Sequence, residues 1–450
     1  MKLRLMGLST QPSQSLKTTC AFCLSEVDMD FFLVGGSIRD AVFGKASSDH
    51  DFVVVNATEE QLLGLGLKKV GKAFPVFITD DGTEIAMARR ENSTGEGYND
   101  FEVETDGVTL DEDLLRRDFT INACASAVVN GGANTDELIC AHPMSRYDLA
   151  HRILRVVDAD RFKEDPLRIL RGLRFAARHN LFIEPETKAL FRQMIEANCL
   201  AHLPKERIWK EIEKAASAEN FWKFVSLCGK FNLFPEISGM KGVRQPKKYH
   251  PEGDVLNHTV LALKHYEEVE LPQYGWNSSD RVTQSLCILC HDMGKRLTLS
   301  ERGNLHGHES DVRDLLSFVD RIGAPKAVRV ATQFCAEQHH RVHGMFVRRA
   351  NRLALWLEEH NQFNNQAIVN ALCMTCVSDA NARLQKVPYL QMNMLAEAVS
   401  QTRKLSPEVV EAIKETDNIQ TKKQLIHKSN VEKVGKILTR YLQIQKDSNA

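Results

Sequence analysis

The sequence carries almost no net charge and has no long apolar run. Its 58 Lys and Arg residues nearly balance its 59 Asp and Glu residues, so the formal net charge is -1. A nucleic-acid partner would therefore have to meet a local basic patch, because no global positive field would attract it. No apolar run is long enough to span a bilayer. Residues 1–20 make a poor secretory signal, because polar residues interrupt their short apolar stretch. We therefore expect a cytoplasmic protein with no membrane partner.

Cysteine is too sparse for a disulfide scaffold, with 11 residues in a chain of 450. A reducing compartment would keep most of these as free thiols. Three pairs have the C-x-x-C spacing that zinc sites use, namely Cys20/Cys23, Cys287/Cys290 and Cys373/Cys376. The last two pairs lie in apolar, helix-like runs, where cysteine is usually a small core residue. Core packing is therefore the favoured interpretation of both.

The pattern of apolar residues changes along the chain from strand-like to helix-like. Between residues 29 and 150, the short apolar runs FFLV, DFVVV, KKVGKAFPVFIT and TEIAMARR predict strands, with one short helix after Gly36. From about residue 151, apolar residues recur at spacings of three and four, which predicts helices. Gly, Pro and basic residues at 240–253 indicate a linker. The fold class is therefore α+β, with a small mixed-sheet head followed by helical domains.

The expected domains follow from this change of pattern. They are an N-terminal extension (1–28), a mixed-sheet head (29–150), an all-α neck and body (151–245), a further all-α domain (246–385) and a helical tail (386–450). We expect the extension to be flexible, because its composition is polar and without pattern. The tail mixes charges of both signs, so a solvated helix is favoured over a surface that contacts RNA phosphates.

The segment GGSIRDAVFGKASSDHDFVVV at 35–55 places Asp49 and Asp51 at the head of an apolar strand. Residues two apart in a strand point to one face, so these carboxylates repel each other unless cations lie between them. Magnesium favours carboxylates together with substrate phosphates. Two such ions about 3.5–4 Å apart can activate an attacking hydroxyl and stabilise the leaving oxygen of an in-line displacement. The alternative is an Asp-rich turn that caps a strand, but the preceding GG-x-x-RD motif favours a metal–nucleotide site.

The glycines of this motif supply the other half of such a site. Gly35 and Gly36 allow close approach of the backbone, and the N-terminus of the following helix favours a polyphosphate. Arg39, one turn into that helix, would add a fixed positive group.

Two arginine-rich segments follow. In DLLRRDFTINA (113–123), Arg116, Arg117 and Asp118 fit a salt-bridged surface turn and a substrate contact equally well. In EDPLRILRGLRFAARH (164–179), Pro166 fits the first helical position with Asp165 as its cap. Arginines then recur along one helix face, which is either solvated or lines a cleft; they are Arg168, Arg171, Arg174 and Arg178.

The pair Asp165 and Arg168 could read a nucleobase directly. Cytosine and adenine both present an amine donor beside a ring-nitrogen acceptor. A carboxylate can accept from the amine while a guanidinium donates to the ring nitrogen. Uracil and guanine present donors where these groups need acceptors. This pair would therefore select CTP and ATP without a template strand, while Arg171 is well placed for a phosphate.

These three motifs, in this order and spacing, resemble the class II CCA-adding enzymes, the tRNA nucleotidyltransferases of the superfamily that includes DNA polymerase beta. The resemblance covers roughly residues 29–385 and is closest to bacterial members with a histidine–aspartate (HD) domain. It implies that the helical domains hold the tRNA acceptor arm and that Asp49 and Asp51 hold magnesium. The implied contacts to the incoming nucleotide are Gly36, Arg39, Arg117, Arg168 and Arg171. Glu84, on a later strand, is a further candidate carboxylate.

A second set of candidate ligands lies in the C-terminal half. The order His258, then adjacent His291 and Asp292, then Asp379 resembles the signature of HD phosphohydrolases. Imidazole and carboxylate ligands suit a divalent metal such as Mg²⁺ or Ni²⁺. Further candidates are His306, His308, His339 and His340. The resemblance implies phosphatase, 2′-nucleotidase and 2′,3′-cyclic phosphodiesterase activity.

Three other functions compete with CCA addition by a monomer or homodimer. A bacterial poly(A) polymerase shares the head motifs, but such enzymes typically lack the HD set and end in a long basic tail. An HD phosphohydrolase with a non-catalytic RNA-binding head would not need the Asp49/Asp51 pair. A non-catalytic RNA-binding protein would need neither set of candidate metal ligands.

Overall fold

The computed structural model describes residues 29–45, 50–70, 76–93, 101–129, 132–133, 137–248, 250–274, 277–382 and 388–449. The expected N-terminal extension, the Cys20/Cys23 pair and Asp49 lie outside these described residues. The chain forms two compact units, the first ending at Leu203 and the second beginning at Pro204. The finer domain boundaries stay predictions. Among the described helices, none has both the length and the apolar character needed to cross a bilayer.

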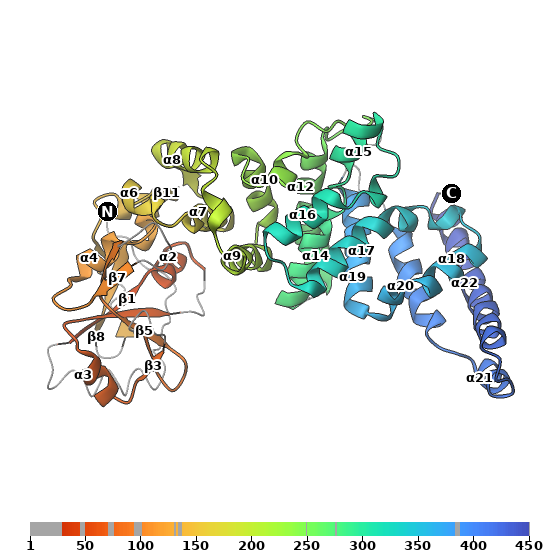
Figure 1. Ribbon diagram of the computed structural model, residues 1–450, viewed down its shortest axis with the longest axis horizontal. Helices are drawn as coiled ribbons and strands as arrows, with labels where there is room; N and C mark the ends of the chain where they lie inside the picture. The colour runs from red at the N-terminus through yellow and green to blue at the C-terminus, as the bar shows by residue number, and fades with distance from the viewer. Residues whose placement is uncertain are drawn as a thin grey trace. The chain divides into compact units, whose positions relative to one another are not determined.

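A mixed sheet forms the centre of the first unit (Figure 1). Its strand order is β10-β8-β1-β2-β5-β4-β3, with β9 beside β8. The strands are β1 (Asp30–Val34), β2 (Asp51–Val55), β3 (Lys68–Val70), β4 (Val76–Ile78), β5 (Glu84–Met87), β8 (Cys124–Val129), β9 (Gly132–Ala133) and β10 (Ile139–Cys140). Strands β2 and β5 are parallel and the other pairs are antiparallel. Separate pairs are β6 (Arg90–Ser93) with β7 (Phe101–Glu104), and β11 (Ile153–Leu154) with β12 (Phe182–Ile183).

The register of the sheet follows from its apolar face. Val34 of β1 pairs with Asp51 of β2, so Val53 lies opposite Phe32. Val34 and Val53 belong to one buried apolar cluster that also contains Leu114. A slip of one residue would turn this apolar set to the other face, so burial fixes where the first residue of β2 lies.

The head also contains helices α2 (Gly36–Val42), α3 (Glu59–Gly64), α4 (Leu110–Leu115) and α5 (Ser145–His151). Local capping defines two of them: Thr58 and Thr109 each form a capping box, with Gln61 and Glu112 respectively. The prediction of a single short helix in this region was therefore wrong. The run KKVGKAFPVFIT is also divided, because its ends form the antiparallel partners β3 and β4.

After the head, the chain is mostly helical as predicted, although Ile153–Leu154 forms β11 within the first expected helical run. The first unit ends with α6 (Ala159–Lys163), α7 (Leu167–His179) and α8 (Pro185–Glu196). Gly172 is needed in α7, because a Cβ there would lie 2.7 Å from ring atoms of both Phe119 and Phe191. This close approach seats α7 against the segment that carries Asp118.

The described part of the second unit is helical throughout (Figure 1). Its helices are α9 (Lys205–Ser217), α10 (Phe221–Phe231), α11 (Pro235–Ser238), α12 (Val255–His265), α13 (Leu271–Tyr274), α14 (Ser278–Cys290), α15 (Lys295–Arg302), α16 (Arg313–Arg321), α17 (Lys326–His343), α18 (Ala350–Glu359), α19 (Gln366–Asn381), α20 (Leu390–Thr402), α21 (Pro407–Lys414) and α22 (Ile419–Asn449). Helices α12, α14, α17 and α19 pack on one another, and α22 packs on α18 and α20. The α+β fold class with an all-helical C-terminal half is confirmed.

The four cysteines of the two C-terminal C-x-x-C pairs are buried free thiols in α14 and α19. The groups of described residues that could hold a metal contain no cysteine. Core packing, the favoured interpretation of these pairs, is therefore confirmed.

Candidate functional site

Asp51 lies where three strands of the head align. It is the first residue of β2, and its register partners are Val34, the last residue of β1, and Glu84, the first residue of β5. Residues in register on neighbouring strands point to the same face, with backbones about 4.8 Å apart. The carboxylates of Asp51 and Glu84 therefore lie side by side at one edge of the sheet. Glu84, a minor candidate from the sequence, is the acidic neighbour of Asp51.

The turn between β1 and α2 brings an arginine close to this edge. Gly35 has a φ of 70°, which favours glycine, and its N–H donates to the Cys124 carbonyl at 3.3 Å. A Cβ at Gly35 would lie only 2.8 Å from Arg117 Nη1. The bare backbone at Gly35 therefore lets the Arg117 guanidinium lie against the end of β1, next to the strand residue that pairs with Asp51.

Arg39 is buried, with only 4% of its surface exposed. Its Nε and Nη2 donate to Asp40 Oδ1 at 2.9 and 2.7 Å, and its Nη1 donates to Asn122 Oδ1 at 2.7 Å. The guanidinium also lies 4.4 Å above the Phe175 ring. Arg39 thus joins α2 to α7 and to the segment after α4, and its predicted contact with a nucleotide stays a prediction.

Asp118 continues this hydrogen-bonded chain to α7. Asn122 Nδ2 donates to Asp118 Oδ1 at 2.8 Å, and Arg171 Nε donates to Asp118 Oδ2 at 2.8 Å. Burial would raise the pKa of Asp118, but the Arg171 guanidinium and the Asn122 amide outweigh it and lower the pKa to about 2. Asn122 was not predicted, although its four-residue spacing from Asp118 in RRDFTIN was a signal. The ionised Asp118 therefore fixes the position of Arg171.

Replacing Asp118 with asparagine is expected to destabilise the first unit at neutral pH and to flatten its acid dependence. A carboxyl whose pKa falls from 3.8 to about 2 on folding contributes roughly 2 kcal/mol at neutral pH. Because the folded pKa is the lower one, the wild-type protein loses this contribution as the pH falls from about 4 towards 2. Urea unfolding at pH 7, 4 and 3 measures the effect, with exposed Asp160→Asn as the matched control. Equal pH slopes for Asp118→Asn and wild type would contradict it.

The RRD turn is ion-paired, but it is not a surface turn. Arg116 Nη2 and Arg117 Nη2 donate to the two oxygens of Asp113 at 2.6 and 3.0 Å. Asp113 is fully buried, and its pKa is nevertheless lowered because the two guanidinium charges outweigh the effect of burial. The interpretation as a salt-bridged surface turn is therefore right about the ion pairs and wrong about the position of Asp113, which is buried. Arg117 Nε is buried and has no hydrogen-bond partner among the described residues.

Helix α7 begins one residue later than predicted, at Leu167, with Pro166 in the capping position. Asp165 still serves the helix start, since its Oδ1 accepts a hydrogen bond from the Leu167 N–H at 3.2 Å. Arg168 Nη1 donates to the Arg161 carbonyl at 2.9 Å. Arg168, Arg171 and Arg178 are partly exposed, whereas Arg174 is buried. The predicted arginine face is therefore accessible except at Arg174.

In the second unit, the four predicted HD residues converge from α12, the end of α14 and α19. His258 Nε2 lies 2.9 Å from Asp379 Oδ1 and 3.8 Å from Asp292 Oδ2. His291 Nε2 lies 3.2 Å from the same Asp292 oxygen. The ligand atoms of His258, His291 and Asp292 all lie within 4.8 Å of one another.

Two of the additional histidine candidates join this cluster. His308 Nε2 lies 3.1 Å and His339 Nε2 lies 3.8 Å from Asp292 Oδ1. The Nδ1 atoms of His291, His308 and His339 lie 2.7, 2.9 and 2.7 Å from backbone carbonyls. This arrangement leaves each Nε2 with its lone pair directed at the carboxylates, as metal-bound histidines require.

The other two histidine candidates lie outside the group that faces Asp292. His306 is exposed, and so is His340, which lines a pocket that opens beside the cluster.

Three residues of the cluster were not among the candidates from the sequence. Glu252 Oε1 lies 2.6 Å from His258 Nδ1 and 2.9 Å from His250 Nδ1, and His343 Nε2 lies 2.7 Å from Asp379 Oδ2. His250 and Glu252 belong to the expected linker, a segment that folds back onto the site. Gln245 N–H donates to the Gly253 carbonyl at 3.4 Å, and Val255 N–H to the Val243 carbonyl at 3.1 Å. Glu252, in the motif HPEGD, lies six residues before His258, and this spacing was only a weak indication that the two residues meet.

The cluster fits a divalent cation. His291 Nε2, His308 Nε2 and Asp292 Oδ1 are buried polar atoms without a hydrogen-bond partner among the described residues, and such atoms are costly unless a ligand satisfies them. Burial would raise the pKa of Asp292, but the neighbouring His291 imidazole and Lys295 ammonium outweigh this effect and hold the pKa well below its usual range. Burial lowers the pKa of His339, so this imidazole is neutral and able to bind a metal.

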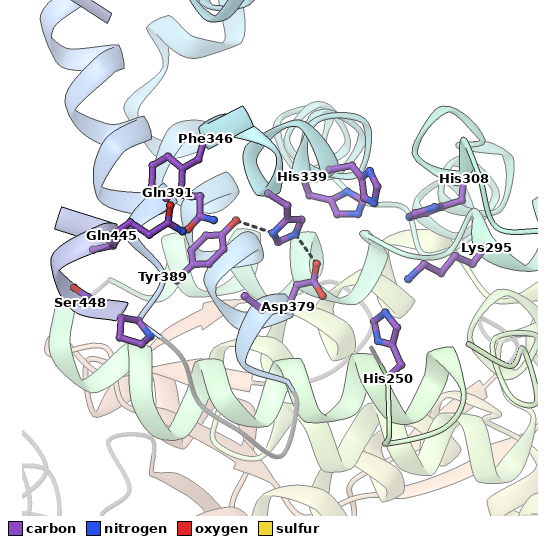
Figure 2. Close-up of a pocket in the computed structure, with 15 residues that line it drawn as sticks. His250, Lys295, His308, His339, Phe346, Asp379, Tyr389, Gln391, Gln445 and Ser448 are labelled. Atoms are coloured by element: carbon purple, nitrogen blue, oxygen red, sulfur yellow. Dashed lines mark hydrogen bonds and ion pairs between the residues drawn. The ribbon is translucent and has the colours of Figure 1, made fainter. Parts of the chain in front are cut away.

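A pocket of about 530 Å³ opens beside the cluster (Figure 2). The end of the pocket nearest the cluster is lined by His308, His339 and Asp379, together with Lys295. The opposite end is lined by residues from the segment after α17, from the start of α20 and from the end of α22. A pocket of this size holds a ligand considerably larger than phosphate alone.

Comparison with known proteins places the chain in a family. Residues 31–139 match the profile of the poly A polymerase head domain, and residues 180–238 match that of a probable RNA and SrmB-binding site of polymerase A. The multifunctional CCA protein of Nitrosococcus oceani is 38% identical over 377 residues, covering 82% of this chain and 89% of that protein. The corresponding protein of Shewanella denitrificans is 36% identical over 378 residues, covering 81% of this chain and 87% of that protein.

Among solved structures, the Thermotoga maritima CCA-adding enzyme complexed with tRNA has a similar fold. Its TM-score is 0.59 at 19% identity, over 96% of this chain and 94% of that one. The sequence motifs, the mixed-sheet head and these relatives agree: the chain belongs to the family of the CCA-adding tRNA nucleotidyltransferases, together with the multifunctional CCA proteins.

Proposed function

We propose that this protein adds and repairs the 3′-terminal CCA of tRNA, using CTP and ATP without a template. The observation that carries the proposal is the alignment of Asp51 with Glu84, beside the Gly35 turn and Arg117. Family membership and the RNA-binding profile at 180–238 support tRNA as the partner. In the reaction, the terminal 3′ oxygen of the tRNA bonds to the α-phosphorus of the nucleotide, and pyrophosphate leaves.

Asp51, with Glu84 beside it and together with Asp49, would hold magnesium at the edge of the sheet. Bound there, two magnesium ions would activate the 3′-hydroxyl and neutralise the leaving pyrophosphate. The Arg117 guanidinium, whose Nη1 lies against Gly35, would bind the triphosphate over the bare backbone of Gly35 and Gly36.

The start of α7 would select the base. Asp165 would accept from the exocyclic amine of cytosine or adenine, and Arg168 would donate to the ring nitrogen. Arg171, which Asp118 holds in place at 2.8 Å, would bind a phosphate. Because Asp165 also accepts from the Leu167 N–H, its carboxylate is already oriented before a nucleotide binds.

We further propose that the HD cluster hydrolyses phosphate esters at damaged tRNA 3′ ends, as a phosphatase, 2′-nucleotidase and 2′,3′-cyclic phosphodiesterase. His258, His291, Asp292 and Asp379 would hold a divalent metal, with His308 and His339 within reach of Asp292 Oδ1. The metal would supply a water nucleophile at neutral pH. Lys295 Nζ donates to Asp292 Oδ2 at 2.6 Å and to Gln245 Oε1 at 2.7 Å. Its third N–H is left for a substrate phosphate.

One incubation separates the candidate functions: purified protein with tRNA lacking its 3′ end and each labelled nucleoside triphosphate in turn. CMP incorporation followed by a single AMP is the expected result. A long A tract would instead indicate the poly(A) polymerase that the head profile also names. Phosphate release without any incorporation would indicate a hydrolase with a non-catalytic head. If neither reaction occurs, the remaining candidate is a non-catalytic RNA-binding protein.

Replacing Glu84 with glutamine is expected to lower incorporation by about tenfold to a hundredfold, because it removes one charge beside Asp51 without changing shape. The loss should shrink as the Mg²⁺ concentration is raised, if Glu84 acts by retaining the cation. Single-turnover incorporation over a range of Mg²⁺ concentrations measures this. Glu59→Gln, an exposed head residue paired with Lys69, serves as the matched control. A Glu84→Gln loss that is independent of Mg²⁺ would argue against the role.

A further inference from the structure

The pocket beside the HD cluster has two chemically different ends (Figure 2). One end carries the metal-ligand cluster and Lys295. The other carries Phe346, Gln391 and Gln445. Tyr389 joins the two ends, because its hydroxyl bonds His343 Nδ1 at 2.7 Å and His343 Nε2 lies 2.7 Å from Asp379 Oδ2. A ligand that fills the pocket would therefore meet charged groups at one end and an aromatic ring with neutral amides at the other.

The two glutamines come from distant parts of the chain. Gln391 lies in the first turn of α20, and Gln445 lies near the end of α22, which packs on α20. Both side chains are half-buried, and no hydrogen bond joins either amide to another described residue. Two other glutamines of this unit are bonded: Gln338 accepts from Trp356 Nε1 at 2.8 Å, and Gln443 donates to Asp447 at 2.7 Å. The two pocket amides are therefore available to a ligand.

These groups match the chemistry of a nucleobase. Each amide offers one acceptor and two donors, which suits a base edge that alternates donors and acceptors. The Phe346 ring offers a face on which a base can stack. We propose that this end of the pocket is a nucleobase subsite for the terminal nucleoside of the RNA, with its phosphate at the HD cluster. The inference rests on the proposed hydrolase function and adds to that site the residues that would hold the terminal base.

In this proposal, the C-terminal helix α22 helps to bind the base through Gln445. With a terminal 2′,3′-cyclic phosphate, water adds to phosphorus and one phosphorus–oxygen bond to the ribose breaks. The released ribose oxygen takes up a proton, so the product is a phosphomonoester. Gln391 and Gln445 take no part in these bonds. They would hold the base so that the phosphate lies between Lys295 and the cluster, and they are positioning residues that act through substrate binding.

The test compares two substrates on the full-length protein: adenosine 2′,3′-cyclic phosphate, and its base-free analogue 1-O-methylribose 2,3-cyclic phosphate. In a Gln391→Ala/Gln445→Ala variant, we expect the ratio of kcat/KM for the nucleotide to that for the analogue to fall about tenfold. The fall should come mainly from a higher KM for the nucleotide. Gln443→Ala, on the same helix but outside this pocket, should keep the wild-type ratio. A ratio unchanged in the double variant, or an equal loss on both substrates, overturns the subsite.

Two further measurements keep the result decisive. Gln445→Glu preserves size at a half-buried helix position and removes the donors, so it should lower the same ratio even if the double variant folds poorly. Calorimetric titration of the metal-free protein, treated with EDTA, with adenosine 2′-monophosphate tests the subsite without catalysis, and the double variant should bind about tenfold more weakly. If the wild-type protein hydrolyses neither substrate but binds the nucleotide more tightly than the double variant does, the hydrolase proposal fails and the subsite stands. Equal binding by wild type and variant overturns the subsite itself.

Discussion

Replacing Asp51 with asparagine is expected to lower incorporation of CMP and AMP into tRNA by about a thousandfold, equivalent to roughly 4 kcal/mol of transition-state stabilisation. Asp51 begins β2 and lies between Val34 and Glu84 in register, so the substitution removes the charge at the point where the carboxylates meet. Asparagine keeps the shape and the strand pairing, and stability should therefore change little. The loss should appear in kcat more than in KM for CTP, because the cations act mainly on the transition state.

Asp30 provides a matched control for this experiment. It is the exposed first residue of β1 and pairs with Val55, at the opposite end of the same two strands. Asp30→Asn should leave incorporation within about twofold of wild type, a change typical of surface positions. The Asp49/Asp51 double alanine variant should abolish incorporation and retain hydrolysis at the HD site. Loss of both activities together would contradict a two-site enzyme.

Replacing Asp292 with asparagine is expected to abolish phosphoester hydrolysis and leave CCA addition intact. Both oxygens of Asp292 face histidine Nε2 atoms, with His291 and His308 at 3.2 and 3.1 Å. The substitution removes the negative charge that draws a cation into this cluster. We expect at least a thousandfold loss of cyclic phosphate hydrolysis, or roughly 4 kcal/mol. Incorporation of CMP by the same preparation shows that the variant is folded.

A thermal unfolding measurement tests the metal directly, without using activity. At about a hundredfold excess over its Kd, a divalent ion that binds only the folded state adds roughly 2.7 kcal/mol. For a unit of this size that raises the Tm by about 5 to 10 °C. Ni²⁺ or Mn²⁺ should produce this rise in the wild-type protein and in exposed Asp320→Asn, and not in Asp292→Asn. A rise of equal size in Asp292→Asn would place the bound metal elsewhere.

The sequence motifs indicated the local part of each candidate site, because the residues of a short motif lie next to one another in the chain. The GG-x-x-RD turn fixes Gly35, Gly36 and Arg39 within one strand-to-helix connection. The adjacent pair His291 and Asp292 ends α14, and the prediction that His258 and Asp379 join it agrees with the distances. Local spacing accounts for the glycine turn and for the His291–Asp292 pair, whereas His258 and Asp379 reach that pair through the packing of α12, α14 and α19.

Other features depended on contacts between residues distant in sequence. Glu84 joins Asp51 only through the parallel register of β2 and β5. The guanidinium of Arg39 contacts Asn122, which lies 83 residues further along the chain, and its predicted contact with a nucleotide stays a prediction. Glu252 and His258 are only six residues apart, but they meet because the backbone of the expected linker folds back at Gly253.

By itself, the sequence determined the chemistry of this protein: which side chains can hold cations, phosphates and bases, and in what order they occur. It could do so because carboxylates, imidazoles and guanidinium groups have fixed preferences wherever they are placed. The tertiary structure alone decided which of these groups meet, since burial and strand register select one set of contacts from many that the sequence allows. That selection placed Glu84 beside Asp51, brought His308 and His339 to Asp292, and set Gln391 and Gln445 along one pocket.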